Sequence, residues 1–74
     1  MNDHPVVILV YSTSHAMRLE RLLQQIDIAC KMTPVPRHLS SDCGVCIQIR
    51  SQDRDKAKQA IAAEGIEING IYLL

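Results

Sequence analysis

The 74-residue chain contains no tryptophan and no phenylalanine, and it has only two tyrosines. Domains that bind single-stranded nucleic acid commonly stack bases on several aromatic rings. The sequence therefore excludes a stacking platform of this kind. Hydrophobic residues still make up 47% of the chain. They are chiefly Ile, Leu, Val and Ala, so we expect a core packed from aliphatic side chains.

A surplus of charge of either sign is also missing. The eight Lys and Arg residues cancel the eight Asp and Glu residues, which leaves a formal net charge of +0. Strong long-range attraction to nucleic acid or to an anionic membrane depends on a basic surplus. We therefore expect neither nucleic acid nor a membrane among the partners.

The chain has no long hydrophobic run and no even set of cysteines. Its apolar run Val6–Val10 is far shorter than the roughly 20 residues of a membrane helix, and the N-terminus lacks a cationic stretch followed by a cleavage site. Three cysteines cannot form a complete disulfide framework, so at least one thiol stays free or pairs between chains. These features predict a cytoplasmic protein.

Hydrophobic patterning predicts a strand followed by a helix in the first part of the chain. The continuous apolar run Pro5–Tyr11 is typical of a central strand with both faces covered. Any of three hydroxyl side chains, Ser12, Thr13 and Ser14, is suited to cap the next helix. Apolar residues then recur at helical spacing, which predicts an amphipathic helix over about His15–Gln25.

Two strands, a helix and a final strand are predicted in the rest of the chain. Alternating apolar residues indicate strands over residues 28–33 and 45–50. Ser51 is expected to cap a second helix, which ends at Gly65. The last strand covers residues 66–74, and an Asn-Gly pair within it indicates that it is short or interrupted.

This order of elements predicts an α+β, ferredoxin-like split β-α-β fold. It has the order βαββαβ, a four-stranded antiparallel sheet, both helices on one face, and a single domain over residues 1–74. In this topology the end of the first strand, near Ser12, lies beside the start of the third, near Cys43. The other sheet face has no helix, although the first strand is apolar on both sides. We therefore expect a second copy of the chain to cover it in a homodimer.

The segment Pro34–Cys46 carries residues that a strand connection does not require. Its Pro-Val-Pro start is stiff and extended. Its length exceeds the need of a hairpin, and such extra length is commonly functional. The thiol of Cys43 is followed by Gly44, which leaves the adjacent backbone unshielded. We interpret Cys43 as a reactive thiol; the alternative is a small apolar filler of the core.

Several groups are candidates to control the charge of this thiol. Amides at the start of the first helix carry partial positive charge that favours a thiolate, and Arg37 adds to it. Asp42 opposes both, because a nearby like charge raises the pKa of a thiol. His15 is a candidate to orient the thiolate or to take its proton; the alternative is an exposed helix-start histidine. Further candidate binding residues are the hydroxyl side chains Ser12, Thr13, Ser14, Ser40 and Ser41.

Cys43 and Cys46 form a Cys-x-x-Cys pair, a weak redox or metal motif when no second pair is present. Positions three apart in a regular strand point to opposite faces, so the two thiols meet only if Cys43 stays in the loop. A metal site that uses both thiols with His38 or a second chain is one alternative. In the other, Cys46 is a half-buried residue on the uncovered sheet face. Cys30 is expected to be an inert core thiol.

Two motifs carry a family resemblance. Tyr-Ser-Thr-Ser-His-Ala stands at positions 11–16, and Pro-Val-Pro-Arg at 34–37 is followed by Ser-Ser-Asp-Cys-Gly at 40–44. With these motifs the chain resembles, over nearly its whole length, a small bacterial family of unknown function described as selenium/sulfur-carrier-like. The family resembles a domain that accompanies a sulfur-carrier module in selenium-metabolism proteins. The resemblance implies that Cys43 holds a persulfide or selenosulfide, and it does not require a cysteine at position 46.

The sequence thus predicts a carrier rather than a turnover enzyme. We expect Cys43 to accept sulfur or selenium from a donor protein and to pass it to an acceptor protein, without a cofactor. Arg37 and the first helix would stabilise the anionic terminal atom, and Gly44 would admit a partner closely. The alternatives are the small metal-binding module and a non-catalytic interaction or regulatory module, for which this type of fold often serves.

Overall fold

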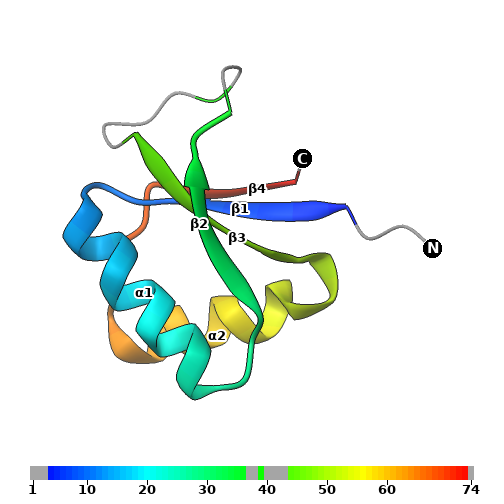
Figure 1. Ribbon diagram of the computed structural model, residues 1–74. Helices are drawn as coiled ribbons and strands as arrows, with labels where there is room; N and C mark the ends of the chain where they lie inside the picture. Colours follow the sequence, from blue (N-terminus) through cyan, green and yellow to red (C-terminus); the bar gives the residue numbers. More distant parts are fainter. Residues whose placement is uncertain (1–3, 37–38, 40–43, 74) are drawn as a thin grey trace.

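The computed structural model describes residues 4–36, 39 and 44–73 of the chain. Four strands and two α-helices follow one another in the order βαββαβ (Figure 1). In chain order the elements are β1 (Pro5–Leu9), α1 (Thr13–Gln25), β2 (Cys30–Pro34), β3 (Val45–Arg50), the short 3-10 helix η1 (Ser51–Asp53), α2 (Arg54–Glu64) and β4 (Gly70–Leu73).

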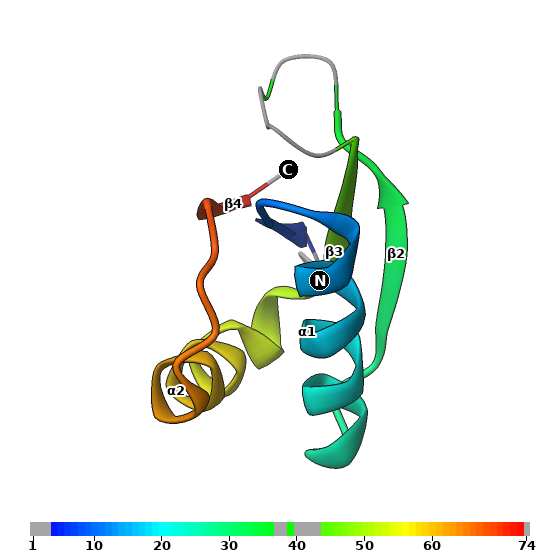
Figure 2. The same ribbon diagram turned by 90° about the vertical axis from the view of Figure 1, so that its left-hand side faces the viewer.

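The four strands form one antiparallel sheet in the order β2-β3-β1-β4. Strand β1 is therefore central, between β3 and β4, while β2 and β4 are the sheet edges. Both helices pack on the same side of the sheet (Figure 2). The predicted ferredoxin-like split β-α-β fold is confirmed.

The main core lies between the sheet and the two helices. Successive strand residues point to opposite faces, so Val6 and Ile8 of β1 and Ile47 and Ile49 of β3 all face the helices. The helices contribute Ala16, Leu19, Leu23, Ala57 and Ile61 to the same cluster. This core is entirely aliphatic, as the lack of Phe and Trp requires.

A second, smaller hydrophobic cluster lies on the sheet face that has no helix, here called the open face. It consists of Val7, Leu9 and Cys46, and the half-buried Val35 and Leu39 pack against it. Val7 and Leu9 are each only 1% exposed within the single chain. Val35 and Leu39 of the β2–β3 connection therefore pack against this part of β1 within one chain, and the homodimer stays a prediction.

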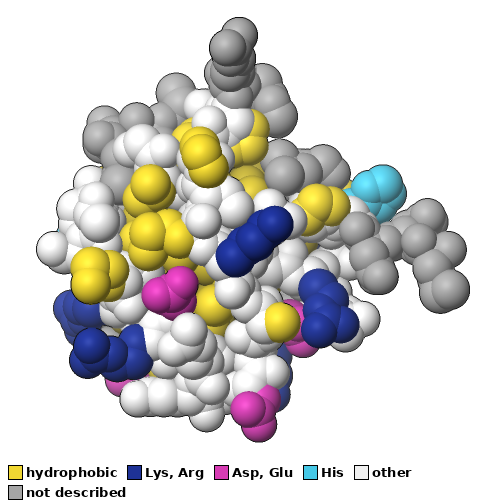
Figure 3. Space-filling model, viewed as in Figure 1, with side chains coloured by type: hydrophobic (Ala, Val, Ile, Leu, Met, Phe, Trp, Pro, Cys, Tyr) yellow, Lys and Arg dark blue, Asp and Glu magenta, His cyan; other side chains and the backbone are white. Residues whose placement is uncertain are grey.

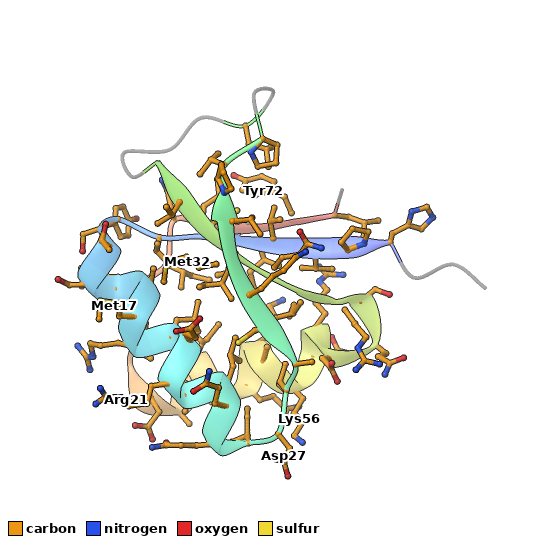
Figure 4. The ribbon with its side chains drawn as sticks, viewed as in Figure 1. Met17, Arg21, Asp27, Met32, Lys56 and Tyr72 are labelled. Carbon is orange, nitrogen blue, oxygen red and sulfur yellow. The ribbon has the colours of Figure 1, made fainter. Side chains whose placement is uncertain are left out.

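Hydrophobic side chains also gather on the surface between α1 and β2 (Figure 3). Met17 of α1 is 58% exposed, and Met32 of β2 is half-buried against the main core. The two methionines lie on the side of the molecule where α1 flanks the edge strand (Figure 4). An exposed hydrophobic surface therefore remains beside the first helix.

Several predicted boundaries shift in the structure. Helix α1 begins at Thr13, two residues earlier than predicted, because Ser12 is its N-cap. Ser51 does not cap the second helix; it opens η1, and α2 follows from Arg54. Strand β4 begins only at Gly70, which confirms that the last strand is short. Strand β3 has the predicted bounds.

No helix within the described part of the chain is long and apolar enough to cross a membrane. The longer of the two α-helices, α1, has 13 residues and one buried face. This agrees with the absence of long hydrophobic runs from the sequence.

The C-terminus of α2 provides a test of the fold. Gly65 has φ +68°, and the amide of Ile66 donates to the Ile61 carbonyl at 3.2 Å, as in a Schellman cap. We expect Gly65→Ala to lower the free energy of unfolding by about 1 kcal/mol, because the left-handed penalty exceeds the entropy gained in the unfolded state. Urea unfolding measures the change.

Gly44→Ala is the matched control, since Gly44 has no positive φ and no atom within 4 Å of an added Cβ. It should leave the free energy of unfolding nearly unchanged. Equal destabilisation by both substitutions would contradict the assignment of Gly65 as a left-handed cap.

Candidate functional site

Three chain segments meet at one end of the sheet. Leu9, the last residue of β1, pairs with Cys46 near the start of β3. The chain then leaves β1 through Val10 and Tyr11 and enters α1 at Thr13. The start of the first helix therefore lies at the sheet end where the β2–β3 connection joins β3, as the topology predicted (Figure 1).

Ser12 organises the helix start. Its Oγ accepts a hydrogen bond from the His15 backbone N–H at 3.2 Å, which is the standard N-cap bond and typically stabilises a helix by about 1 kcal/mol. The same Oγ lies 2.7 Å from Nδ1 of His15. Ser12 thus fixes both the first helical turn and the imidazole.

The His15 ring is held on two sides. Besides its contact with Ser12, it meets the Tyr11 ring edge to face, with centroids 6.2 Å apart and planes at 72°. When the Ser12 hydroxyl donates to Nδ1, the neutral imidazole carries its proton on Nε2. His15 can then offer an N–H donor to a group outside this cluster, so it is a positioned residue rather than a freely rotating surface histidine.

The first turn of α1 carries partial positive charge that none of its own side chains offsets. It contains no acidic residue, and the first amides of a helix have no intrahelical acceptors and carry partial positive charge. Thr13 and Ser14 are exposed in this turn. A nearby anion would be stabilised here, which is the electrostatic condition expected for a thiolate site.

The β2–β3 connection is anchored at both of its described ends. The Val35 N–H donates to the Gly44 carbonyl at 3.2 Å, and the Leu39 N–H donates to the Pro36 carbonyl at 3.0 Å. Val35 and Leu39 also pack on the open face. Gly44 is exposed with open space around it, so a partner would meet little steric hindrance at this residue.

Cys46 is fully buried, not half-buried as one alternative predicted. It faces Val7 and Leu9 on the open face. Its thiol donates to the Pro34 carbonyl at 3.7 Å, and its Sγ lies 3.3 Å from Oγ1 of Thr33. Thr33 pairs with Cys46 across β2 and β3. These contacts enclose the thiol and support a structural role.

Cys30 lies on the helix side of β2, half-buried against the main core as predicted. Its thiol donates to the Glu20 carbonyl at 4.0 Å. Burial raises the pKa of Cys30, and the negative charge of Glu20 raises it further. Cys30 therefore stays protonated and is a poor nucleophile at neutral pH.

The remaining predicted site residues lie outside the described residues. They are Arg37, His38, Ser40, Ser41, Asp42 and Cys43. Of the described candidates, Ser12 and His15 are in contact, whereas Cys46 lies beneath the connection on the open face. The sequence did not predict the contact of Tyr11 with His15 or the contact of Thr33 with Cys46.

A metal site was the alternative reading of the Cys-x-x-Cys pair. Within residues 4–36, 39 and 44–73, no group of three or more His, Cys, Asp or Glu side chains could hold a metal ion. The predicted ligands Cys43 and His38 are not among these residues, so that alternative stays a prediction.

The raised pKa of Cys30 gives a testable result. We expect its alkylation by iodoacetamide to show an apparent pKa above the ordinary thiol value of about 8.5. As the pH rises, the Cys30 thiol ionises in the unfolded chain before it ionises in the folded protein. The contribution of Cys30 to the free energy of unfolding is therefore present at neutral pH. It is lost as the pH rises through the folded pKa. Site-resolved mass spectrometry, with urea-unfolded protein as control, measures this; an apparent pKa at or below the unfolded value would contradict it.

The family model described as "Putative Se/S carrier protein-like" matches residues 6–73. This range runs from β1 to the end of β4 and includes both quoted motifs. No curated protein and no solved structure matches the chain. The protein thus belongs to the "Putative Se/S carrier protein-like" family.

Proposed function

We propose that the protein carries sulfur or selenium as a persulfide or selenosulfide on Cys43 and relays it between a donor and an acceptor protein. The observation that carries this proposal is the pairing of Leu9 with Cys46, which brings the α1 start to the end of the sheet where β3 begins. Cys43 stands three residues before Cys46 in the chain. The family description supports the same chemistry.

The loading step is an exchange between a thiolate and a persulfide. The Cys43 thiolate attacks the terminal sulfur of a donor persulfide, R–S–SH, and a new S–S bond forms to Cys43. The donor S–S bond breaks, and R–S⁻ leaves with the electron pair. The carrier then holds Cys43–S–SH, and no external oxidant or reductant is needed. When the terminal atom is selenium, the corresponding bonds form and break in the same way.

The helix start supports the anionic forms in this cycle. The first turn of α1 has no acidic residue to offset its partial positive charge, and a positive environment lowers the pKa of a thiol. His15 is held by Ser12 and Tyr11 with an Nε2–H donor in one neutral tautomer. In this proposal the helix start stabilises the thiolate or persulfide anion, and His15 donates to it.

The described cysteines favour a mechanism with one reactive thiol. Cys46 is enclosed and donates to the Pro34 carbonyl, and Cys30 has a raised pKa. Neither environment is typical of a nucleophile or metal ligand, both of which are thiolates. A zinc titration of the reduced protein tests the metal-binding alternative directly, since tight binding would favour it.

Loading at Cys43 is the central prediction. After treatment with glutathione persulfide, mass spectrometry should find a mass increase of one sulfur atom on the peptide containing Cys43. Cys43→Ser should abolish this modification, because a hydroxyl is a far weaker nucleophile than a thiolate at neutral pH.

The matched control for loading is Cys30→Ser, which removes a thiol outside the proposed site and should leave loading unchanged. Circular dichroism checks that both variants are folded. Persistent loading of folded Cys43→Ser protein would refute the proposed role of Cys43.

The pH dependence of Cys43 alkylation tests the electrostatic part of the proposal. We expect an apparent pKa below the free-thiol value of about 8.5, because the helix start and Arg37 favour the thiolate. Alkylation of the reduced protein across a pH series, read by peptide mass spectrometry, gives the value. An apparent pKa at or above that of the unfolded chain would mean that the site does not activate the thiol.

A further inference from the structure

The end of the open face opposite the β2–β3 connection carries a group of hydrogen-bond donors. Lys31 of β2 pairs with Gln48 of β3, and Arg50 lies two residues further along β3 on the same face. Arg50 pairs in turn with Pro5 of β1. Lys31, Gln48 and Arg50, here called the basic patch, thus project from two adjacent strands to one side.

None of the described strand residues on this face is acidic. All the described acidic residues belong to helices or to the turns that follow them: Glu20, Asp27, Asp53, Asp55, Glu64 and Glu67. Asp27 and Lys56 lie at the helical side of the molecule, away from Tyr72 on β4 (Figure 4). Among the described residues no carboxylate pairs with the basic patch, although the chain as a whole has a formal net charge of +0.

The patch borders a surface groove of about 320 Å³. Lys31, Gln48 and Arg50 line it together with Pro5 and Ala29. Lys31 and Arg50 are exposed, and Gln48 is half-buried. No ion pair or side-chain hydrogen bond engages these three residues within the described part of the chain. Their donors are available to a molecule that approaches the open face.

Protection of a sheet edge does not explain the whole patch. An exposed lysine on an edge strand discourages unwanted strand pairing, and β2 is an edge, so this reason accounts for Lys31. Gln48 and Arg50 belong to β3, which is paired on both sides. Their position on the open face calls for another reason.

We propose that the basic patch is the docking surface for an acidic surface of the protein that donates or accepts the carried atom. This inference rests on the proposed carrier function and adds the partner's recognition chemistry. Carboxylates of the partner would pair with Lys31 and Arg50, and Gln48 would donate its amide hydrogens between them. Such charge pairing mainly speeds association and orients the partner.

A second copy of this chain is a poorer occupant for the same surface. A dimer whose two-fold axis passes through the patch would bring Lys31 and Arg50 of one copy near the same cations of the other, and like charges facing each other across an interface are unfavourable. An acidic partner has the opposite electrostatic balance. The covered hydrophobic cluster at the other end of the face also removes one reason for self-association.

The patch lies close enough to the described residues of the β2–β3 connection for one partner to reach both. Val35 and Leu39 of the β2–β3 connection pack on the open face, the face that carries the patch. The six residues of β3 separate the two ends, a distance of about 17 Å at 3.4 Å per residue. A standard protein interface of about 800 Å² per partner spans this distance.

An acidic peptide tests the charge recognition while the partner is unidentified. We expect a hexaglutamate peptide to shift the backbone amide NMR signals of Lys31, Gln48 and Arg50 in the full chain, with hexalysine giving no such shifts. The shifts should disappear in about 0.5 M NaCl, because salt screens exposed charges. The double charge reversal Lys31→Glu with Arg50→Glu should weaken peptide binding roughly tenfold or more.

Lys56→Glu with Lys58→Glu is the control, since it reverses two exposed charges on α2 and gives the same net charge. It should leave the peptide shifts at the patch in place. The proposal would be overturned if the peptide caused no NMR shifts at the patch or if its shifts were concentrated on α2. It would also be overturned if both double variants lost peptide binding equally. So would a wild-type dimer, seen by sedimentation, that the Lys31 and Arg50 reversal dissociates.

Loading by a small donor separates this proposal from the carrier function itself. Glutathione persulfide does not require a protein docking surface, so the Lys31 and Arg50 reversal should leave loading of Cys43 unchanged. If neither the wild-type protein nor any variant is loaded at Cys43, the carrier proposal fails. The NMR shifts caused by the peptide then still show, independently of loading, whether the basic patch binds an acidic molecule. If loading is normal but the peptide does not bind at the patch, only the docking proposal fails.

Discussion

The central position of β1 is the constraint on which the rest of the molecule depends. Its residues Val6–Leu9 are at most 1% exposed, because the helices cover one face and Val35 and Leu39 pack on the other. Hydrogen bonds to β3 and β4 fix its position in the sheet. Since only three residues separate the end of β1 from the start of α1, the burial of this strand also determines where the helix start and the candidate site lie.

Much of this fold was predictable because the burial pattern of each strand is local. Strand β3 alternates cleanly between apolar and polar residues, and its predicted bounds agree with the structure. Ser51 was a poor guide to the second helix, because three residues turn as η1 before α2 begins and no side chain caps that helix. Cap residues are favoured at turns in general, so a serine alone does not determine where an α-helix starts.

The burial of Cys46 could not be predicted, because its cover comes from a distant segment. In the sequence Cys46 stands on the more polar face of β3, beside Gln48. The packing of Val35 and Leu39 on that face, together with the contacts to Thr33 and Pro34, encloses the thiol. The placement of His15 was predictable in part: its helix-start position followed from the hydroxyl run, but the contact of its ring with Tyr11 depends on how β1 turns into α1.

The net charge of the chain is zero, but this value does not describe how the charges are distributed over the surface. The described acidic residues all lie in the helices or in the segments that follow them, whereas the described charged strand residues on the open face are Lys31 and Arg50. A chain with no net charge can therefore present an electrostatic field with a definite direction. Because Val35 and Leu39 pack on that same face, a partner drawn to the cations would meet the face that also carries these residues of the β2–β3 connection. Orientation of this kind requires separation of charge rather than an excess of it.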